Sequence, residues 1–393
     1  MIRTSTIKLR AAMAFVLGAG LLCGAAAGAA ETLKIGVIAA LTGGGAPWGM
    51  AAAEGSRILA DRVNQAGGLD VGGRRVKVEV IAYDDQYKAA EAVAAYNRLV
   101  NQDGVKYIVI LSSAATLALK QNAEDDQVVM MTGAYTSKAL DKNSHYVFRM
   151  YSAPEDYLPS MIGWMKDNLQ GRRVMVVNPN DESGWDQVRL SEAIFKEKGF
   201  EVLGHELYER AQKDFQPMLT RIIAMKPDMI ELGGTPPATA GLIIRQAREL
   251  GYDRLFTKTG GAGPRDIVAG AGAEAAEGII NMLYADQSNA GYRALVADYK
   301  KRNQGQEPNE IIVPFYDGAN TLLHAIQKAG TIDDTAKVMA AFKKTLPMAS
   351  LQGDPMTLGG MKHYGADAQI MTVNYIGTIR KGEPVVLGKT SND

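Results

Sequence analysis

The feature that most constrains the fold of this chain is a regular alternation of short apolar runs and helix-like stretches. The runs Leu33–Ala39, Val76–Tyr83, Tyr107–Leu111 and Val128–Met131 are each followed by a turn or loop and a helical pattern. Short runs of this kind are typical of strands, and connections that contain a helix join parallel strands. The alternation therefore predicts a parallel sheet covered by helices on both faces.

The same alternation begins again near Ser152. Its predicted strands span residues 173–178, 200–203, 228–232 and 279–284. Two series predict the α/β fold class, with two similarly built, doubly wound parallel-sheet lobes. The end of the chain departs from this pattern, because 368–380 and 385–387 are typical of an antiparallel pair that turns at Lys381-Gly382.

Residues 1–30 predict a secretory signal peptide. Arg3, Lys8 and Arg10 form a basic start, Ala11–Leu22 is an apolar run, and the small residues Ala27–Ala30 offer cleavage points. The run is too short to span a membrane, and no later stretch approaches about 18 uninterrupted apolar residues. We therefore expect export to the periplasm.

The composition narrows the class of protein. Cys23, the only cysteine, lies inside the predicted leader, so we expect no disulfide, thiol nucleophile or thiolate metal site in the mature chain. The 43 basic and 43 acidic residues are mixed along the chain, which argues against nucleic acid as a partner. The roughly 360 residues after the leader are enough for two domains of about 150 residues each.

Hydroxyl-rich turns follow two neighbouring strands of the first series. Tyr107–Leu111 leads into Ser112 and Ser113, and Val128–Met131 leads into Thr132–Thr136. Ligands of open α/β sheets bind where strands end, and helix N-termini there favour anionic groups. The two turns therefore predict a rim that holds a small anionic molecule through hydroxyls and backbone N–H groups.

Catalytic and cofactor motifs are missing from the sequence. Gly43–Gly45 is not followed by Gly-Lys-Ser/Thr, and Trp48 stands where a dinucleotide motif needs a glycine. Ser183 lacks the flanking glycines of a nucleophile elbow. No two histidines have metal-ligand spacing; they are His145, His205, His324 and His363. We expect a protein that is not an enzyme and uses no cofactor or metal.

Several short segments, taken in their order and spacing, carry a family resemblance. They are Leu33–Thr42, Asn64–Gly68, Tyr83–Asp85, Ser112–Thr116, Thr132–Thr136 and Ala276–Gly278. The chain resembles periplasmic solute-binding proteins of the leucine/isoleucine/valine-binding type, which feed an ABC transporter. The resemblance implies two lobes that close on a ligand by a hinge, a membrane permease as partner, and a monomer.

The resemblance also implies where the lobes are divided. Three hinge crossings are expected near 151–154, 282–285 and 352–355. The first lobe would then comprise 31–151 plus 285–353, and the second 152–284 plus 354–393.

Family binding residues can be matched to positions of this chain. The serine and threonine that hold a ligand carboxylate match Ser113 and Thr136, beside Ser112 and the Ala134 backbone. Trp48 matches an aromatic wall residue. Pocket tyrosines of the family fall at Ser183 and Thr235, and its disulfide positions at Tyr87 and Ser112, so that bridge is missing. The acid that pairs with a ligand ammonium falls at about Gly260, and neither Gly260 nor Gly261 can replace it.

These departures suggest a ligand that keeps a carboxylate but lacks an α-ammonium group, because a buried ammonium without a partner is costly. Aromatic acids, oxo acids and similar small acids fit, with Trp48, Tyr135 and Trp185 as walls. In the alternative, Asp181, Glu182 or Asp186 replaces the acid and the protein binds branched-chain or other amino acids. A ligand-sensing module of a signalling system is the alternative of another class.

Overall fold

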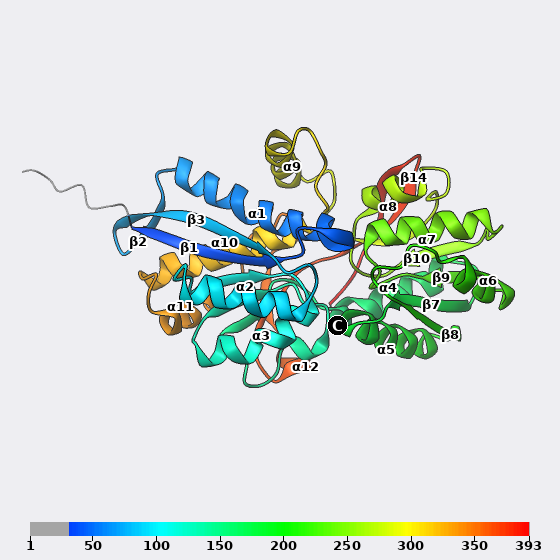
Figure 1. Ribbon diagram of the computed structural model, residues 1–393, viewed down its shortest axis with the longest axis horizontal. Coiled ribbons are helices and arrows are strands. Elements are labelled where there is room, and N and C mark those ends of the chain that lie inside the picture. The colour runs from blue at the N-terminus through cyan, green and yellow to red at the C-terminus, as the bar shows by residue number, and fades with distance from the viewer. Residues whose placement is uncertain (1–30, 393) are drawn as a thin grey trace, which may run out of the picture.

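A computed structural model describes residues 31–392, which form two α/β lobes side by side (Figure 1). Each lobe is a sheet with helices packed on it, as the two strand–helix series predicted. The expected signal peptide lies outside the described residues. Within them, no helix is long and apolar enough to cross a membrane.

The first lobe is built on an eight-stranded sheet whose central strands run parallel. The strands β4 and β5 are buried along their whole length, because helices cover both faces of the sheet. Across the sheet, the strands are β12 (Thr357–Gly359), β13 (Gln369–Met371), β6 (Val147–Arg149), β5 (Val129–Thr132), β4 (Tyr107–Ile110), β1 (Thr32–Ala39), β3 (Arg74–Asp84) and β2 (Leu69–Val71).

Helices cover this sheet in two groups. One group pairs α1 with α10, and the other pairs α2 with α3. The helices of this part of the chain are α1 (Ala46–Gln65), α2 (Ala89–Asn101), α3 (Ser113–Asp125), α9 (Ala290–Arg302), α10 (Ile312–Ala329), α11 (Thr335–Phe342) and α12 (Met361–Tyr364), with the short 3-10 helices η1 (Gly43–Gly45) and η2 (Ser137–Ala139).

The second lobe is built on a seven-stranded sheet. Its strands, in order across the sheet, are β15 (Glu383–Lys389), β14 (Tyr375–Arg380), β11 (Ile280–Leu283), β10 (Leu255–Lys258), β9 (Met229–Glu231), β7 (Arg173–Pro179) and β8 (Glu201–Tyr208). The strands from β8 to β11 are parallel, and β14 and β15 form an antiparallel pair as predicted. The first part of the predicted strand 368–380 instead forms β13 in the sheet of the first lobe. The helices are α4 (Pro154–Asn168), α5 (Glu182–Glu197), α6 (Gln216–Ala224), α7 (Pro237–Glu249) and α8 (Pro264–Ala271).

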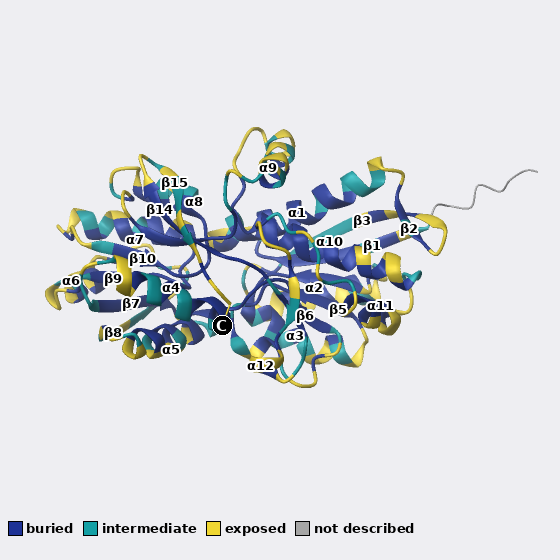
Figure 2. Cartoon of the chain, turned by 180° about the vertical axis from the view of Figure 1, so that it is seen from behind, coloured by how far each residue is buried: buried dark blue, intermediate teal, exposed yellow. Residues whose placement is uncertain are grey.

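The chain passes between the sheets three times: from β6 to β7, after β11, and from β13 to β14. Figure 2 shows largely buried segments where the lobes meet. The third crossing lies between β13 and β14 and not at the expected residues 352–355, because residues 357–371 belong to the first sheet. There β13 pairs with β6, and the Arg149 side chain donates to Gln369 at 3.0 Å. Strands of only three residues give too short a pattern to be recognised in the sequence.

Two helices of the first lobe begin with a proline in the first turn. The helix α1 starts at Ala46, with Pro47 in its first turn, where a missing N–H costs nothing. The helix α10 starts at Ile312, with Pro314 also in the first turn.

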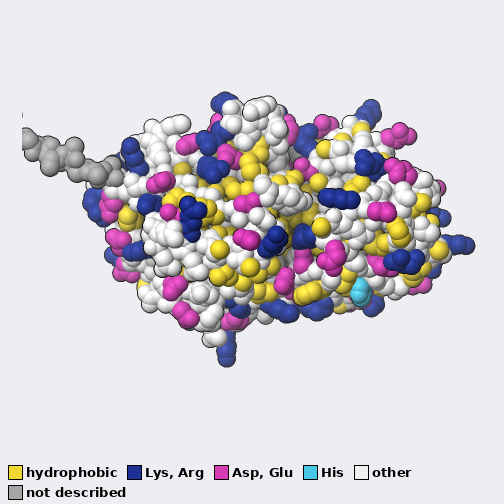
Figure 3. Space-filling view, in the orientation of Figure 1, with side chains coloured by type: hydrophobic (Ala, Val, Ile, Leu, Met, Phe, Trp, Pro, Cys, Tyr) yellow, Lys and Arg dark blue, Asp and Glu magenta, His cyan; other side chains and the backbone are white. Residues whose placement is uncertain are grey.

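Charges of both signs are interspersed over the face of the two lobes seen in Figure 3. This distribution agrees with the zero net charge of the sequence. The charges do not gather into one large basic patch on that face.

Candidate functional site

A pocket lies between the two lobes, near the carboxyl ends of the parallel strands. It contains about 410 Å³ of empty space, part of which is open to solvent. Both lobes and two of the crossings contribute to its wall, so the pocket is complete only when the lobes are together. It is lined by Trp48, Tyr87, Leu111, Ser113, Gly133, Tyr135, Tyr151, Ser183, Gly233, Gly234, Gly261, Tyr284 and Ile311.

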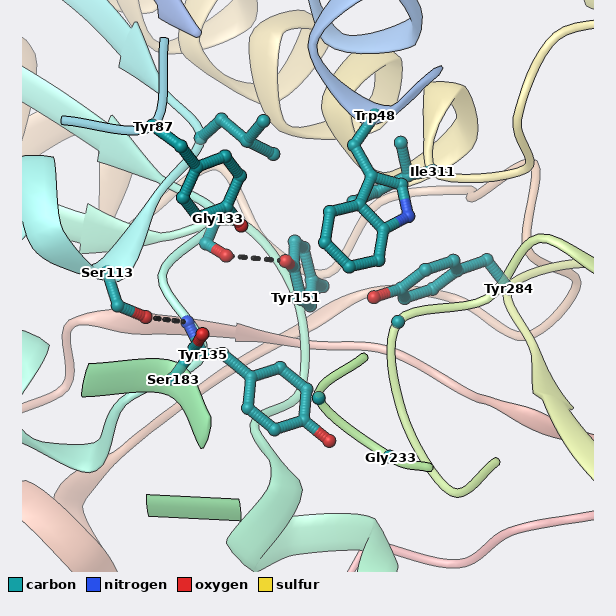
Figure 4. Close-up of a pocket in the computed structure, with 13 residues that line it drawn as sticks. Trp48, Tyr87, Ser113, Gly133, Tyr135, Tyr151, Ser183, Gly233, Tyr284 and Ile311 are labelled. Atoms are coloured by element: carbon teal, nitrogen blue, oxygen red, sulfur yellow. Dashed lines mark hydrogen bonds between the residues drawn. The ribbon is translucent and has the colours of Figure 1, made fainter. Parts of the chain in front are cut away.

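Five of the thirteen lining residues are aromatic, and Figure 4 shows their rings around a shared space. The ring centroids of Trp48 and Tyr87 are 6.5 Å apart, and those of Tyr151 and Tyr284 are 5.5 Å apart. Burial raises the pKa of the hydroxyls of Tyr87, Tyr135, Tyr151 and Tyr284, that of Tyr151 to about 12. The hydroxyls are therefore neutral, and the wall suits a flat, largely apolar ligand.

Ser113 is the first residue of α3 and lines the pocket. The N-cap Ser112 accepts the Ala115 N–H at 3.1 Å and so fixes the first turn of the helix. The Ser113 hydroxyl oxygen accepts the N–H groups of Tyr135 at 3.0 Å (Figure 4) and Thr136 at 3.1 Å. Its own O–H is left to donate, and a helix N-terminus adds partial positive charge. This end of the pocket suits a carboxylate.

Thr136 joins the lobes instead of lining the pocket. Its hydroxyl donates to the Asp186 carboxylate of α5, which also accepts the Ser137 N–H at 3.1 Å. Arg189 donates to the Ser137 hydroxyl at 3.0 Å. These bonds connect the turn after β5 in the first lobe to a helix of the second lobe, so the structure has the lobes closed against each other at this edge.

The expected carboxylate clamp must therefore be revised. Of Ser113, Thr136 and the Ala134 backbone, only Ser113 lines the pocket. The Ala134 N–H is already donated to the Thr132 hydroxyl at 2.8 Å, and the Thr136 hydroxyl is taken by Asp186. The sequence could not show that neighbouring side chains already use the hydrogen bonds of the Ala134 N–H and the Thr136 hydroxyl.

Ser183 lines the second-lobe side of the pocket, at the start of α5. The N-cap Asp181 accepts the N–H groups of Ser183 and Gly184, each at 3.1 Å, and the Ser183 hydroxyl at 2.6 Å. It also forms an ion pair with Arg210. The Arg210 guanidinium lies 4.0 Å from the centre of the Tyr87 ring, which belongs to the first lobe. The Asp181 carboxylate is thus fully engaged within the protein.

No residue of the pocket lining, within the described part of the chain, carries a carboxylate. The three acids considered as replacements all lie elsewhere: Asp181 caps α5, Asp186 binds Thr136, and Glu182 is outside the lining. Among residues 31–392, no group of three or more His, Cys, Asp or Glu side chains is placed to hold a metal ion.

Tyr135 occupies the space beside Gly260, the position to which the family resemblance assigns an acid. A Cβ atom on Gly260 would lie 1.8 Å from the Tyr135 hydroxyl oxygen, far inside any allowed contact. That hydroxyl also lies 3.0 Å from the Tyr157 hydroxyl. A side chain at position 260 and the Tyr135 ring therefore exclude each other when the lobes are closed.

The structure brings together several of the predicted site residues, namely Trp48, Ser113, Tyr135, Ser183 and Gly261. The others lie outside the pocket lining. Ser112 is a helix cap, the Thr235 hydroxyl donates to the Val177 carbonyl at 3.1 Å, and Trp185 is 49% exposed. The expectation that Trp185 walls the pocket is wrong, because its indole faces outward at the start of α5 and donates to Asn180 at 2.9 Å.

Sequence reasoning missed several lining residues: Tyr87, Leu111, Gly133, Tyr151, Gly233, Gly234, Tyr284 and Ile311. Tyr151 and Tyr284 follow the last strands before two crossings, a position that could have marked them as cleft residues. Tyr87 follows Asp84-Asp85, and the Asp85 carboxylate accepts the Tyr87 N–H at 2.9 Å. The acidic pair thus shapes the loop that carries a pocket ring.

Comparisons with known proteins agree with this architecture. Residues 32–383 match the periplasmic binding protein family. A leucine-, isoleucine-, valine-, threonine- and alanine-binding protein of Pseudomonas aeruginosa is 28% identical over 309 residues, 78% of this chain and 80% of that relative. A leucine-binding protein structure from Thermotoga maritima has a TM-score of 0.79 at 23% identity, covering 92% of this chain and 99% of its own.

A second solved structure, an ABC transporter solute-binding protein from R. palustris in complex with benzoate, has a TM-score of 0.79 at 21% identity. It covers 92% of this chain and 98% of its own. Two lobes, three crossings and an interlobe pocket define a solute-binding receptor of the type I fold. The chain belongs to the periplasmic binding protein family, with the leucine/isoleucine/valine-binding proteins among its relatives.

Proposed function

We propose that this protein is the periplasmic receptor of an ABC importer for a small carboxylate without an α-ammonium group, such as an aromatic or oxo acid. It would be exported by a cleaved signal peptide, act as a monomer, and present the closed, ligand-bound form to a membrane permease. It binds its ligand without transforming it.

One observation carries the choice of ligand class. The Tyr135 hydroxyl fills the space into which a side chain on Gly260 would extend. A ligand ammonium in this pocket would meet no lining carboxylate, and burying such a charge without a partner costs several kcal/mol. A ligand without the ammonium avoids that cost.

The remaining features of the pocket support a carboxylate on a flat body. Ser113 and the N-terminus of α3 offer donors and partial positive charge at one end. The rings of Trp48, Tyr135 and Tyr284 supply apolar surface around it. Their neighbouring hydroxyls can bond a polar substituent of the ligand.

An amino acid is the second candidate. The observation in its favour is the relative from Pseudomonas aeruginosa, whose name states that it binds leucine, isoleucine, valine, threonine and alanine. Proteins of this fold also include one in complex with benzoate, so the fold alone does not decide between the two ligand classes.

Ligand binding would favour the closed arrangement by contacting both lobes. The first lobe provides Ser113, the second provides Ser183, and the rings of Tyr151 and Tyr284 lie at the crossings between them. A ligand that touches all of these binds the closed form more tightly than the open form and shifts the population toward it.

A thermal-shift panel tests the proposal, because a ligand that binds only the folded protein raises its melting temperature. The panel pairs leucine with isocaproate and phenylalanine with hydrocinnamate, and adds benzoate. Each pair differs only by the α-ammonium group. We expect stabilisation by acids and not by amino acids. Stabilisation by leucine alone would reject the proposed ligand class in favour of the second candidate.

A further inference from the structure

Lys258 is a buried lysine beside the pocket that the carboxylate site does not explain. It is the last residue of β10 and is 1% exposed. Its ammonium nitrogen donates to the carbonyl oxygens of Gly233 at 3.1 Å and Gly260 at 2.5 Å. The same nitrogen lies 5.8 Å from the centre of the Trp48 ring of the first lobe.

These contacts place Lys258 directly behind the pocket wall. Gly233 and Gly261 line the pocket, and a Cβ atom on Gly261 would lie 3.2 Å from the lysine nitrogen and 2.8 Å from the Trp48 ring. The lysine therefore touches the wall at the turn that contains Gly260. Glycines in this turn leave room for the ammonium between two backbone carbonyls and an aromatic face.

Those surroundings are what an ammonium group requires. Carbonyl oxygens accept its N–H bonds, and an aromatic face stabilises its charge. The nearest buried acid, Glu231, accepts two bonds from Thr259 and one from Thr257, so the backbone carbonyls remain the direct acceptors for Lys258. Burial lowers the pKa of the Lys258 ammonium to about 7, and Glu231 opposes part of that shift.

We propose that Lys258 is a specificity-determining residue that supplies, from the protein, the amine that an amino-acid ligand would bring into the pocket. The lysine nitrogen occupies the carbonyl acceptors of Gly233 and Gly260, so a ligand ammonium finds neither a free acceptor nor a carboxylate there. In its protonated form Lys258 would also repel a second positive charge beside it. This inference rests on the proposed function and names the residue that enforces it.

The test replaces Lys258 and measures two affinities by calorimetry, for hydrocinnamate and for phenylalanine. The Lys258→Met variant keeps a long apolar stem but removes the nitrogen and frees both carbonyls. Lys258→Leu is a second apolar variant that also leaves both carbonyls without a side-chain donor. The matched control is Arg248→Met in the same lobe. The Arg248 guanidinium lies 5.1 Å from the centre of the Phe256 ring and donates to the carbonyls of Tyr252 and Arg254, so this variant also removes a cation held by an aromatic ring and two carbonyls.

We expect the preference of the wild-type protein for hydrocinnamate over phenylalanine to fall by about tenfold or more in both Lys258 variants, because phenylalanine gains acceptors. The control should keep the wild-type preference. Damage to the fold lowers both affinities together, so a gain for phenylalanine cannot arise from it. An unchanged preference in whichever Lys258 variant folds would overturn the inference, whereas a wild-type protein that prefers phenylalanine would overturn the proposed function itself.

Discussion

The hydroxyl oxygen of Tyr135 lies within 1.8 Å of where the Cβ of a side chain on Gly260 would be. Tyr135 follows β5 of the first lobe, and Gly260 follows β10 of the second. The pair therefore approaches only because the lobes are closed. At the position to which the family resemblance assigns an acid, this chain has a glycine, and an aromatic hydroxyl fills the adjacent space.

Gly260→Ala should therefore weaken ligand binding by about tenfold or more, because overpacking costs about 1–3 kcal/mol in the closed form. The backbone of Gly260 needs no positive φ, so the cost is one of space. The melting temperature of the ligand-free protein should change little if its lobes are open. The measurement is a calorimetric titration with the best acid.

The control is Gly163→Ala in α4, where an added methyl meets no atom within 4 Å. It should leave the affinity unchanged. A second substitution, Tyr135→Ala, should remove the penalty of Gly260→Ala, as a double-mutant cycle would show. If Gly260→Ala lowered the affinity equally in the wild-type protein and in the Tyr135→Ala variant, the two residues would not compete for the same space.

Ser113 and Ser112 are adjacent but should have separable roles. Ser113→Ala removes the hydroxyl that holds the Tyr135 and Thr136 backbone and faces the pocket, so carboxylate affinity should fall by about tenfold, as for loss of a hydrogen bond to a charged group. Ser112→Ala removes a helix cap and should cost about 1 kcal/mol of stability with little loss of affinity. Chemical denaturation and titration of both variants check this. Unchanged affinity in Ser113→Ala would remove this turn from the site.

Thr136→Val tests the interlobe contact. The hydroxyl donates to Asp186 across the lobes and lies outside the pocket lining. Its loss should destabilise the closed form and weaken every ligand by a similar factor, about three- to tenfold. Thr220→Val, which removes an exposed hydroxyl bonded within α6, is the control. A change in the ratio of acid to amino-acid affinity would instead place Thr136 in ligand recognition.

Glu310 should make stability depend on pH. One carboxylate oxygen accepts from Gln287 at 2.8 Å, the other is buried without a partner, and burial raises the pKa of this carboxyl to about 7. Its contribution to stability is fully present below the unfolded pKa of about 4.3 and is lost as pH rises through about 7.

Glu310→Gln cannot ionise, so it should stabilise the protein more at pH about 8 than at about 5, by up to about 3 kcal/mol. Urea unfolding at both pH values measures the difference. The exposed Glu79→Gln is the control and should give a much smaller difference. An equal effect of Glu310→Gln at both pH values would show that the carboxyl is not protonated in the folded protein.

The sequence was sufficient for the fold because the strand–helix alternation is long and regular. It failed where elements are short. The strands β12 and β13 have three residues each, and the pairing of β13 with β6 depends on contacts such as that between Gln369 and Arg149, which are distant in the chain. Such contacts leave no local periodicity.

The sequence indicated the turns that border the pocket but not which of their side chains line it. Trp48 and Ser113 were expected in the site, and both line the interlobe pocket. Thr136 and Trp185 were also expected there but do not line it, because an interlobe bond to Asp186 and a bond to Asn180 turn them away from the pocket. The absence of an acid at position 260 was visible in the sequence, but its physical reason, the Tyr135 hydroxyl, required the closed structure.

The most direct test of the account is a calorimetric titration of the wild-type protein with hydrocinnamate and with phenylalanine. The two molecules share a carboxylate and a ring and differ only by the α-ammonium. The account predicts that hydrocinnamate binds at least about a hundredfold more tightly, the equivalent of about 3 kcal/mol. Phenylalanine binding as tightly as hydrocinnamate, or more tightly, would contradict it.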